Sequence, residues 1–354
     1  MIQKAIHKAV GGRNLSEEEM QEAMTAVMGG QASPAQIGAL LVGLRMKGET
    51  VEEITAAARV MRGACHLVNC AARERGELLV DTCGTGGDNS GTFNVSTVAA
   101  FVTAGAGARV AKHGNRAVSS RSGSADLMEA LGVNLDLTPE EIGVCLDEVG
   151  LGFLFAQKLH PAMRFAAGPR RELGLRTIFN LLGPLTNPAG AGAQVLGVFE
   201  ESLTRPLAEV LGRLGSKSAF VVHGRGGYDE ITVTGVTRIA RLHEGKVEDL
   251  EIAPEDLGFE RRRPAEIRVE GPEESLAKCR QVLAGEPGAA RDMVCLNAGA
   301  ALTAAGLAAD LPQGVRLAQE SLDQGQAQAK MAALVELSQR LVANRPQAVA
   351  GAAS

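Results

Sequence analysis

Phosphate-binding chemistry is indicated first by a glycine-rich segment, residues 84–97, which follows a short apolar run in the 354-residue chain. Its glycines would let the backbone approach an anion closely, and the N-terminus of a following helix would add a favourable dipole. Neutral donors or oxygen ligands follow at Thr92, Asn94, Ser96 and Thr97. The spacing matches neither the Walker loop nor the dinucleotide fingerprint. On its own, the segment fits a tight turn before a capped helix equally well.

A second segment adds positive charge and hydroxyl groups directly after the next expected strand. Its donors are Lys112, His113, Asn115 and Arg116, and its hydroxyls are those of Ser119, Ser120, Ser122 and Ser124. Charged donors beside hydroxyls bind phosphate and pyrophosphate oxygens. A solvated basic turn is the alternative for this loop alone. Two such loops at the ends of adjacent strands favour a shared phosphate site.

Paired carboxylates at Asp229 and Glu230 indicate a candidate magnesium site. Mg²⁺ prefers oxygen ligands and commonly bridges protein carboxylates to substrate phosphates. A lone Asp-Glu pair is more often a solvated acidic turn, so the assignment depends on the two phosphate-binding segments.

A further stretch, residues 157–187, holds an arginine that could bind a substrate carboxylate through two hydrogen bonds. The candidates are Arg170 and Arg171, and an ion pair within their helix, toward Glu172, is the structural alternative. The same stretch holds His160, and a lone histidine is more often structural than catalytic.

Helices are predicted for the first seventy residues. Helix starts are marked at Ser16, Ser33 and Thr50, where a hydroxyl residue precedes a Glu three positions later or a Pro at the first helical position. We expect a small helical domain over residues 1–74, joined by a segment at about 170–190, and an α/β domain over residues 75–354.

Short apolar runs alternate with helical segments from residue 77 onward. Strands are predicted at 78–81, 108–111, 133–137, 151–155, 194–199 and 219–222, with helices at 95–106, 125–131 and 139–149. This alternation predicts a mainly parallel central sheet covered by helices, with ligands at the carboxyl ends of the strands. Hairpin-like β-structure is expected at 231–233, 238–242 and 247–252, and helix returns at 275–283 and after 292.

The composition excludes several classes of partner. A net charge of −5 and an aromatic content of 3% favour neither nucleic acid nor an anionic membrane. No apolar run is long enough to cross a membrane, and we expect no signal peptide. The six cysteines form no CxxC pair, which favours reduced thiols in the cytoplasm over a zinc site.

Taken together, these motifs resemble those of the anthranilate phosphoribosyltransferases, in the order in which that family carries them. The matching pieces are Gly84–Asp88, Asn94–Thr97, Lys112–Arg116, Ser122–Asp126, Arg176–Pro188 and Asp229–Glu230. Each piece alone is modest, but the ordered set is specific and spans most of the chain. One departure is Arg121, which stands where lysine is common.

The resemblance implies a reaction and a set of site residues. Anthranilate would receive the 5-phosphoribosyl group of phosphoribosyl pyrophosphate (PRPP) in tryptophan biosynthesis, giving N-(5-phosphoribosyl)anthranilate and pyrophosphate. PRPP would be bound by Gly84, Gly87, Asp88, Thr92, Asn94, Val95, Ser96, Thr97, Lys112, His113, Gly114, Asn115, Arg116, Ser119, Ser120 and Ser124. Anthranilate would contact Gly84, Asn115 and Arg170, with His113 and His160 along its route. Two Mg²⁺ ions per subunit would be held by Ser96, Asp229 and Glu230.

The resemblance also implies an active site between the two domains and a homodimer formed through the helical one. We expect the aniline nitrogen to attack C1′ of PRPP through an oxocarbenium-like transition state, while Mg²⁺ and Lys112 neutralise the leaving pyrophosphate. No nucleophilic residue or strong general base is needed, because that nitrogen already has a free lone pair.

Two other classes of protein remain as alternatives. A pyrimidine nucleoside phosphorylase of the same broad fold would share the helical domain and the glycine-rich loop, but it should lack the strings at 112–116 and 180–188. A nucleic-acid-binding relative would need a basic surface and salt-sensitive binding, and the net charge counts against it.

Overall fold

The computed structural model describes residues 2–87, 90–117 and 123–345, so the predicted site residues Asp88, Ser119 and Ser120 lie outside the described ranges. Four helices open the chain: α1 (Ile2–Val10), α2 (Glu17–Met28), α3 (Pro34–Lys47) and α4 (Val51–Gly63). The three predicted helix starts are confirmed, because Ser16, Ser33 and Thr50 each form a reciprocal capping box.

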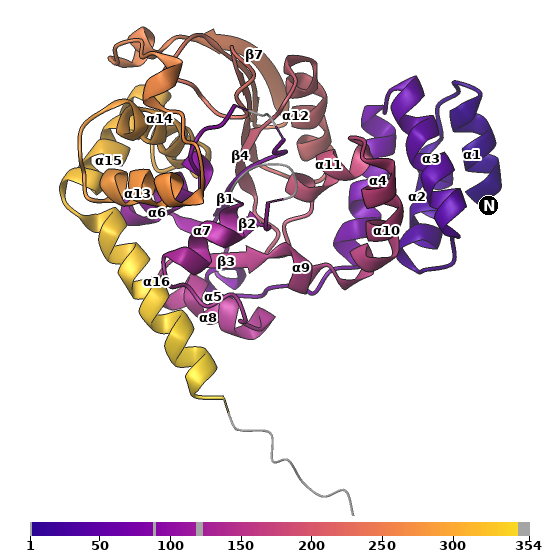
Figure 1. Ribbon diagram of the computed structural model, residues 1–354, viewed down its shortest axis with the longest axis horizontal. Coiled ribbons are helices and arrows are strands. Elements are labelled where there is room, and N and C mark those ends of the chain that lie inside the picture. The colour runs from indigo at the N-terminus through magenta and orange to yellow at the C-terminus, as the bar shows by residue number, and fades with distance from the viewer. Residues whose placement is uncertain (1, 88–89, 118–122, 346–354) are drawn as a thin grey trace, which may run out of the picture.

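A helix from the middle of the chain returns to this helical domain. It is α10 (Arg164–Leu173), which packs against α3 and α2, and Figure 1 shows it beside them on the right. Phe165 of α10 fits closely over Gly30, where an added Cβ would lie 2.6 Å from the ring. The short helix α11 (Ile178–Leu182) follows and contacts α4 and α3.

Seven strands form the central sheet of the larger domain, in the order β3-β2-β1-β4-β5-β6-β7. They are β1 (Leu79–Gly84), β2 (Arg109–Gly114), β3 (Leu151–Phe155), β4 (Ala193–Gly197), β5 (Ser218–Gly224), β6 (Thr237–His243) and β7 (Lys246–Ile252). The first five pair in parallel and the last two antiparallel. The predicted fold, a helical domain beside a mainly parallel sheet covered by helices, is confirmed.

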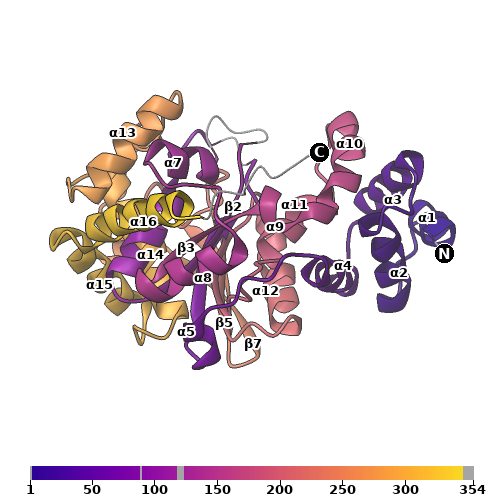
Figure 2. The same ribbon diagram turned by 90° about the horizontal axis from the view of Figure 1, so that it is seen from below.

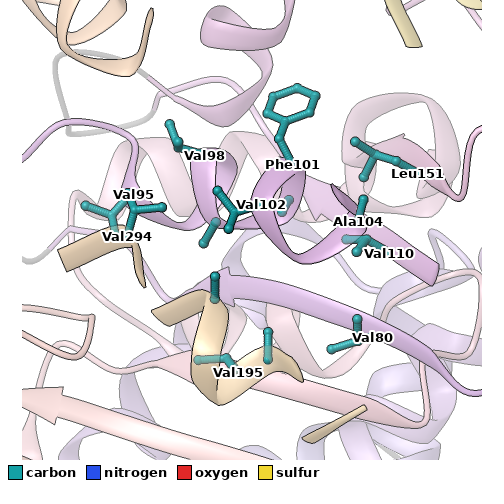
Figure 3. Packing of buried hydrophobic residues seen from close by; sticks show 14 of the residues in the cluster. Val80, Val95, Val98, Phe101, Val102, Ala104, Val110, Leu151, Val195 and Val294 are labelled. Atoms are coloured by element: carbon teal, nitrogen blue, oxygen red, sulfur yellow. The ribbon is translucent and has the colours of Figure 1, made fainter. Parts of the chain in front are cut away.

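One face of the sheet is covered by long helices from both halves of the domain. They are α6 (Val95–Gly105), α14 (Ala289–Ala304) and α16 (Gln326–Ala343), and α15 (Leu311–Asp323) packs against all three. Figure 3 shows Val98 and Val102 of α6 in the apolar layer that includes Val80 and Val110 of the strands. Further helices of this domain are α5 (Ala71–Glu74), α7 (Ser124–Ala130), α8 (Pro139–Glu148), α9 (Ala156–Leu159) and α13 (Pro272–Leu283). Within the described residues, no helix has the length and apolar character needed to span a membrane.

The opposite face of the sheet shares its core with the helical domain. Helix α12 (Thr204–Arg213) packs against β5 and β6 on one side and against α4 on the other, as Figure 2 also shows. A single apolar cluster therefore runs from the sheet through α12 into α1–α4. Arg62 of α4 reinforces this junction by donating hydrogen bonds to the carbonyl oxygens of Leu185 and Leu214.

Two of the predicted strands are wrong, and in both places side chains from distant segments bind the backbone. Residues 133–137 form turns between α7 and α8, where the Asn134 N–H donates to Ser338 of α16. Residues 231–233 do not join the sheet either. The Ile231 N–H and carbonyl both pair with the side-chain amide of Asn297 on α14, which replaces the expected strand partner.

Candidate active site

The two phosphate-binding segments predicted from the sequence start at neighbouring strand ends. Strands β2, β1 and β4 are adjacent and parallel, and they end at Gly114, Gly84 and Gly197. The carboxyl edge of a parallel sheet is where ligands of α/β proteins bind. The structure therefore brings the glycine-rich loop, the Lys112 segment and the acidic pair to one edge of the sheet.

The glycine-rich loop is held against Asp229. Its Gly86 N–H donates to Oδ2 of Asp229 at 3.0 Å, and its Thr85 N–H donates to the Gly197 carbonyl at 2.9 Å. Two glycines make this approach available: an added Cβ would lie 2.3 Å from the Asp229 carboxylate at Gly84 and 1.5 Å from the Asp229 carbonyl oxygen at Gly197. Because both positions are glycine, Asp229 can pack directly against the backbone at the start of the loop and at the end of β4.

The three predicted metal ligands meet at one small cavity. Ser96, Asp229 and Glu230 all line it, together with Thr82 and Asn297. Hydroxyl and carboxylate oxygens are the donors that Mg²⁺ prefers, so these residues fit that ion. Because Asn297 pairs with both backbone groups of Ile231, it also fixes the chain directly after the acidic pair.

Of the predicted ligands before and in the first turn of α6, Ser96 is the one that lines this cavity among the described residues. The Ser96 carbonyl accepts a hydrogen bond from Thr82 at 2.8 Å, which ties the helix start to β1. Asn94 accepts from Ser275 of α13 at 2.8 Å. The Thr97 hydroxyl is fully buried and has no hydrogen-bond partner within the described residues. Thr92 pairs with the Ser90 hydroxyl at 3.0 Å.

Lys112 is buried at the same edge of the sheet, with 2% of its surface exposed. Burial lowers its pKa, and the nearby carboxylates of Asp81 and Asp229 oppose that shift. Among the described residues its ammonium has one hydrogen bond, at 3.3 Å to the His113 carbonyl. The buried ammonium therefore has N–H donors that no described residue uses, and it lies near Asp229, which lines the cavity.

A residue that sequence reasoning missed, Asp81, supports the Lys112 segment. Asp81 is fully buried, and it accepts hydrogen bonds from the His113 N–H at 3.1 Å and from Asn187 at 2.8 Å. Burial raises the pKa of this carboxyl, while Lys112 acts against that shift. The sequence did contain a signal for this role, because Asp81 is the charged residue that ends the apolar run 78–81.

The loop after β2 is fastened to α7. Asp126 accepts hydrogen bonds from the N–H groups of Ala117 and Gly123, at 3.1 and 2.9 Å, and so closes the two ends of the loop. The guanidinium of Arg116 bonds Asp126 and Glu129 of α7. The hydrogen bonds to Glu129 and Asp126 raise the pKa of Arg116. The structure thus turns this predicted phosphate ligand toward carboxylates of the protein.

Three other predicted ligands, Gly114, Asn115 and Ser124, meet where this loop begins. Ser124 accepts a hydrogen bond from the Asn115 N–H at 3.1 Å. Only glycine fits at position 114, because an added Cβ would lie 2.2 Å from the Ser124 hydroxyl.

The two histidines predicted along the anthranilate route lie together. Nε2 of His113 is 3.2 Å from Nε2 of His160, and both rings are buried. Asn115, two residues after His113, accepts from Gln157 of α9 at 3.3 Å. Burial lowers the pKa of His113 to about 3 and that of His160 to about 4, so the pair is neutral at neutral pH.

Arg170, the predicted carboxylate ligand, lies on α10. Its guanidinium lies 5.1 Å from the centre of the Phe179 ring, and burial lowers its pKa. The alternative of an ion pair with Glu172 is not found among the described residues. No hydrogen bond within the described residues joins Arg170 to Asn115 or the histidines.

The fold and the site define a class of two-domain glycosyl transferases. A profile described as "Glycosyl transferase family, helical bundle domain" matches residues 3–65, and one described as "Glycosyl transferase family, a/b domain" matches residues 76–328. The two matches correspond to α1–α4 and to the domain that contains the sheet.

Closer relatives narrow the class. The anthranilate phosphoribosyltransferase of Thioalkalivibrio sulfidiphilus is 56% identical over 337 residues, covering 95% of this chain and 98% of that protein. The one from Moorella thermoacetica is 53% identical, with 95% and 98% covered. The chain belongs to the anthranilate phosphoribosyltransferase family, as its motifs predicted.

Solved structures of this family share the fold. The crystal structure of the Thermus thermophilus enzyme matches with a TM-score of 0.88 at 47% identity, covering 95% of this chain and 99% of that one. The Saccharomyces cerevisiae enzyme in complex with PRPP and Mg matches with a TM-score of 0.85 at 25% identity, covering 96% and 98%.

Proposed function

We propose that this chain transfers the 5-phosphoribosyl group of PRPP to the amine of anthranilate, giving N-(5-phosphoribosyl)anthranilate and pyrophosphate, as a step of tryptophan biosynthesis. The observation that carries the proposal is the joining of the glycine-rich loop to the acidic pair, through the 3.0 Å hydrogen bond from Gly86 to Asp229. A phosphate-binding loop and a set of magnesium ligands at one sheet edge suit a pyrophosphate substrate.

The PRPP site in this proposal is centred on the loop and the start of α6. Its ligands are the residues that the family resemblance implies, with Asp88, Ser119 and Ser120 included by that likeness. Arg116 is assigned the additional task of holding its loop to α7, because its guanidinium bonds Asp126 and Glu129. Asn94 and Thr97 would act chiefly through the backbone of the first turn of α6.

Magnesium is assigned to Ser96, Asp229 and Glu230, with two ions per subunit. Support comes from the shared cavity of these oxygen donors and from the yeast relative, whose structure contains PRPP and Mg. When bound, Mg²⁺ supplies positive charge that neutralises pyrophosphate oxygens.

The protein's own contribution to the chemistry is electrostatic and positional. Lys112 is a positive charge in a water-poor place, where it interacts with developing negative charge on the leaving group more strongly than it would in water. Holding the two substrates in line supplies much of the remaining rate enhancement.

The buried histidines have a limited part in this mechanism. A general base works best when its pKa is near the working pH, and the pKa values of about 3 and 4 make His113 and His160 weak bases. We therefore assign them to lining and orienting the anthranilate route. Arg170 and Asn115, with Gly84 near both substrates, would bind anthranilate itself.

The proposal extends to assembly and location. The helical domain exposes two apolar side chains on neighbouring helices, Val10 of α1 at 69% and Met46 of α3 at 83%, which suits a homodimer formed through this domain. The six cysteines are free thiols, which suits the reducing cytoplasm.

The test is the loss of anthranilate fluorescence on adding PRPP and Mg²⁺, with a parallel run in EDTA. We expect magnesium-dependent loss that falls at least about a hundredfold in an Asp229→Ala/Glu230→Ala variant, since the metal's charge on the leaving group is removed. Thermal unfolding confirms that the variant is folded. A folded wild-type protein that leaves anthranilate unchanged would rule out this substrate and favour the phosphorylase or nucleic-acid-binding alternatives.

A further inference from the structure

Arg176 lies in the short link between α10 and α11, and its backbone is fixed on both sides. Gly174, in the left-handed conformation with a φ of 59°, ends α10. Thr177 begins α11, and its N–H donates to the Asn180 side chain at 3.0 Å. The arginine therefore extends from a well-defined point of the chain.

The side chain of Arg176 contacts the glycine-rich loop and a residue that holds the loop. Its guanidinium donates a hydrogen bond to the Gly87 carbonyl and lies 4.1 Å from the centre of the Phe199 ring. The Phe199 N–H in turn donates to the Thr85 hydroxyl at 3.1 Å. Both partners of Arg176 thus belong to one assembly around the loop.

The contact between Arg176 and Gly87 makes the loop more favourable for binding an anion. A carbonyl oxygen is partly negative and would oppose a phosphate beside it, whereas a guanidinium bonded to that carbonyl offsets its charge. Gly86 and Gly87 both have left-handed φ values, +65° and +71°, which few residues other than glycine adopt. A backbone with this much freedom needs outside contacts to hold one conformation.

The same contact joins the two substrate sides. Arg176 follows α10, which carries Arg170 and packs on α3 and α2 of the helical domain. The loop on the other side is bonded to Asp229. Through Arg176, the segment assigned to anthranilate reaches the loop assigned to PRPP.

We propose that Arg176 is a positioning residue, which holds the glycine-rich loop in its PRPP-binding conformation and couples that loop to the α10 segment on the anthranilate side. This inference rests on the proposed function. It adds a residue that the implied substrate ligands do not include.

The first experiment compares Arg176→Met and Arg176→Lys with the wild-type chain in the anthranilate fluorescence assay. Arg176→Met should raise the KM for PRPP about tenfold or more, because a charged hydrogen bond to the loop is lost. Its kcat should stay within about threefold, since Arg176 touches no reacting atom, and its unfolding temperature should be unchanged. Lysine keeps the charge but loses the planar stacking group, so Arg176→Lys should fall between the two.

A matched control exists on α10, the helix that precedes Arg176. Arg164, at the start of α10, also stacks on a phenylalanine, with its guanidinium 4.7 Å from the Phe165 ring. Its ring partner packs over Gly30 of the helical domain, away from the glycine-rich loop. Arg164→Met should leave the KM for PRPP unchanged, which separates the effect of the loop contact from that of losing a stacked arginine.

A double-mutant cycle tests whether Arg176 acts through the loop assembly. Phe199→Leu should raise the KM for PRPP about threefold, and combining it with Arg176→Met should add little, because both changes release the same loop. Fully additive effects would overturn the positioning role. So would an unchanged KM for PRPP, or a fall in kcat accompanied by a lower unfolding temperature.

Coupling is measured by calorimetry of PRPP binding with and without 2-hydroxybenzoate, an anthranilate analogue that lacks the amine. We expect the analogue to tighten PRPP binding to the wild-type chain and to have little effect in Arg176→Met. Equal coupling in both proteins, or none in the wild type, would overturn this part of the inference. A wild-type chain that binds PRPP yet consumes no anthranilate would refute the proposed function while leaving the loop contact testable.

Discussion

Both domains of the protein bury a lysine, and the two lysines are satisfied to very different degrees. In the helical domain, Lys47 forms a 2.5 Å ion pair with Glu53 and also donates to Asn14 and to the Gly48 carbonyl. Glu53 uses its other oxygen to accept from the Leu15 N–H at 2.8 Å. At the sheet edge, Lys112 has the single hydrogen bond to the His113 carbonyl within the described residues.

An ammonium group has three N–H donors, so the two lysines differ in how many donors remain for a ligand. The Lys47 network is closed: each charge is paired inside its own domain, as expected where the purpose is to fix α3 against α4. Lys112 lies near Asp81 and Asp229 without closing such a network, which leaves its donors for a ligand. Buried charge with donors to spare is the mark of the candidate site.

The largest expected effect comes from Lys112→Met. We expect kcat to fall by about a hundredfold to a thousandfold, because one preorganised charge that stabilises the leaving group is lost. Steady-state rates at saturating PRPP and anthranilate measure it, with the unfolding free energy recorded alongside.

Lys47→Met is the matched control, because it removes the other buried lysine. Leaving Glu53 buried without its partner should lower the unfolding free energy by about 3–5 kcal/mol, while the folded fraction keeps its kcat. If Lys47→Met lowered kcat, or if Lys112→Met retained it, the distinction between the two lysines would be wrong.

Arg170 gives the next effect, on substrate affinity. Arg170→Ala should raise the KM for anthranilate about 10- to 100-fold, because a charged hydrogen bond contributes about 1.5–3 kcal/mol, and should leave the KM for PRPP unchanged. Arg171→Ala is the control, and it also decides between the two adjacent arginines. A larger effect at Arg171 would transfer the anthranilate role to that residue.

The smallest effect is the pH dependence of stability that the buried histidines produce. Their pKa values in the folded state, about 3 for His113 and about 4 for His160, lie below the unfolded value near 6.5. The unfolded chain therefore binds more protons in that interval. The contribution of the pair to stability is complete above about pH 6.5 and is lost as the pH falls through about 4 for His160 and about 3 for His113.

Urea unfolding at pH 5.0 to 7.5 checks this prediction. Each histidine should contribute a slope approaching about 1.4 kcal/mol per pH unit within the interval. A His113→Asn/His160→Gln variant should lose that part of the slope, whatever its stability at pH 7.5. An identical slope in the variant would mean that the histidines are not buried in neutral form.

The features that the sequence predicted well depend on residues close together in the chain. The capping boxes at Ser16, Ser33 and Thr50 are local, and so is the alternation that gave the parallel sheet. The glycine-rich loop and the Lys112 segment could be placed at strand ends for the same reason, since each is joined to an apolar run without a break.

The failures share the opposite cause. Residues 133–137 and 231–233 look like strands, but Ser338 and Asn297, more than 60 positions away in each case, bind their backbone instead. The contact of Arg176 with Gly87 joins residues 89 positions apart and could not be read from either motif. Partners of this kind are fixed only when the whole chain has packed.

The shared core beneath α12 limits how this protein can be divided or recombined. A cut in the linker after α4 looks natural on the chain, yet it would pass through one continuous apolar cluster and expose Leu207 and Leu211 of α12. Exchanging helical domains between relatives would succeed only if α10, α11 and the facing surface of α12 travelled with them. At this junction the part that must be exchanged as a whole is a packed surface, formed by the helical domain, by α10 and α11, and by α12.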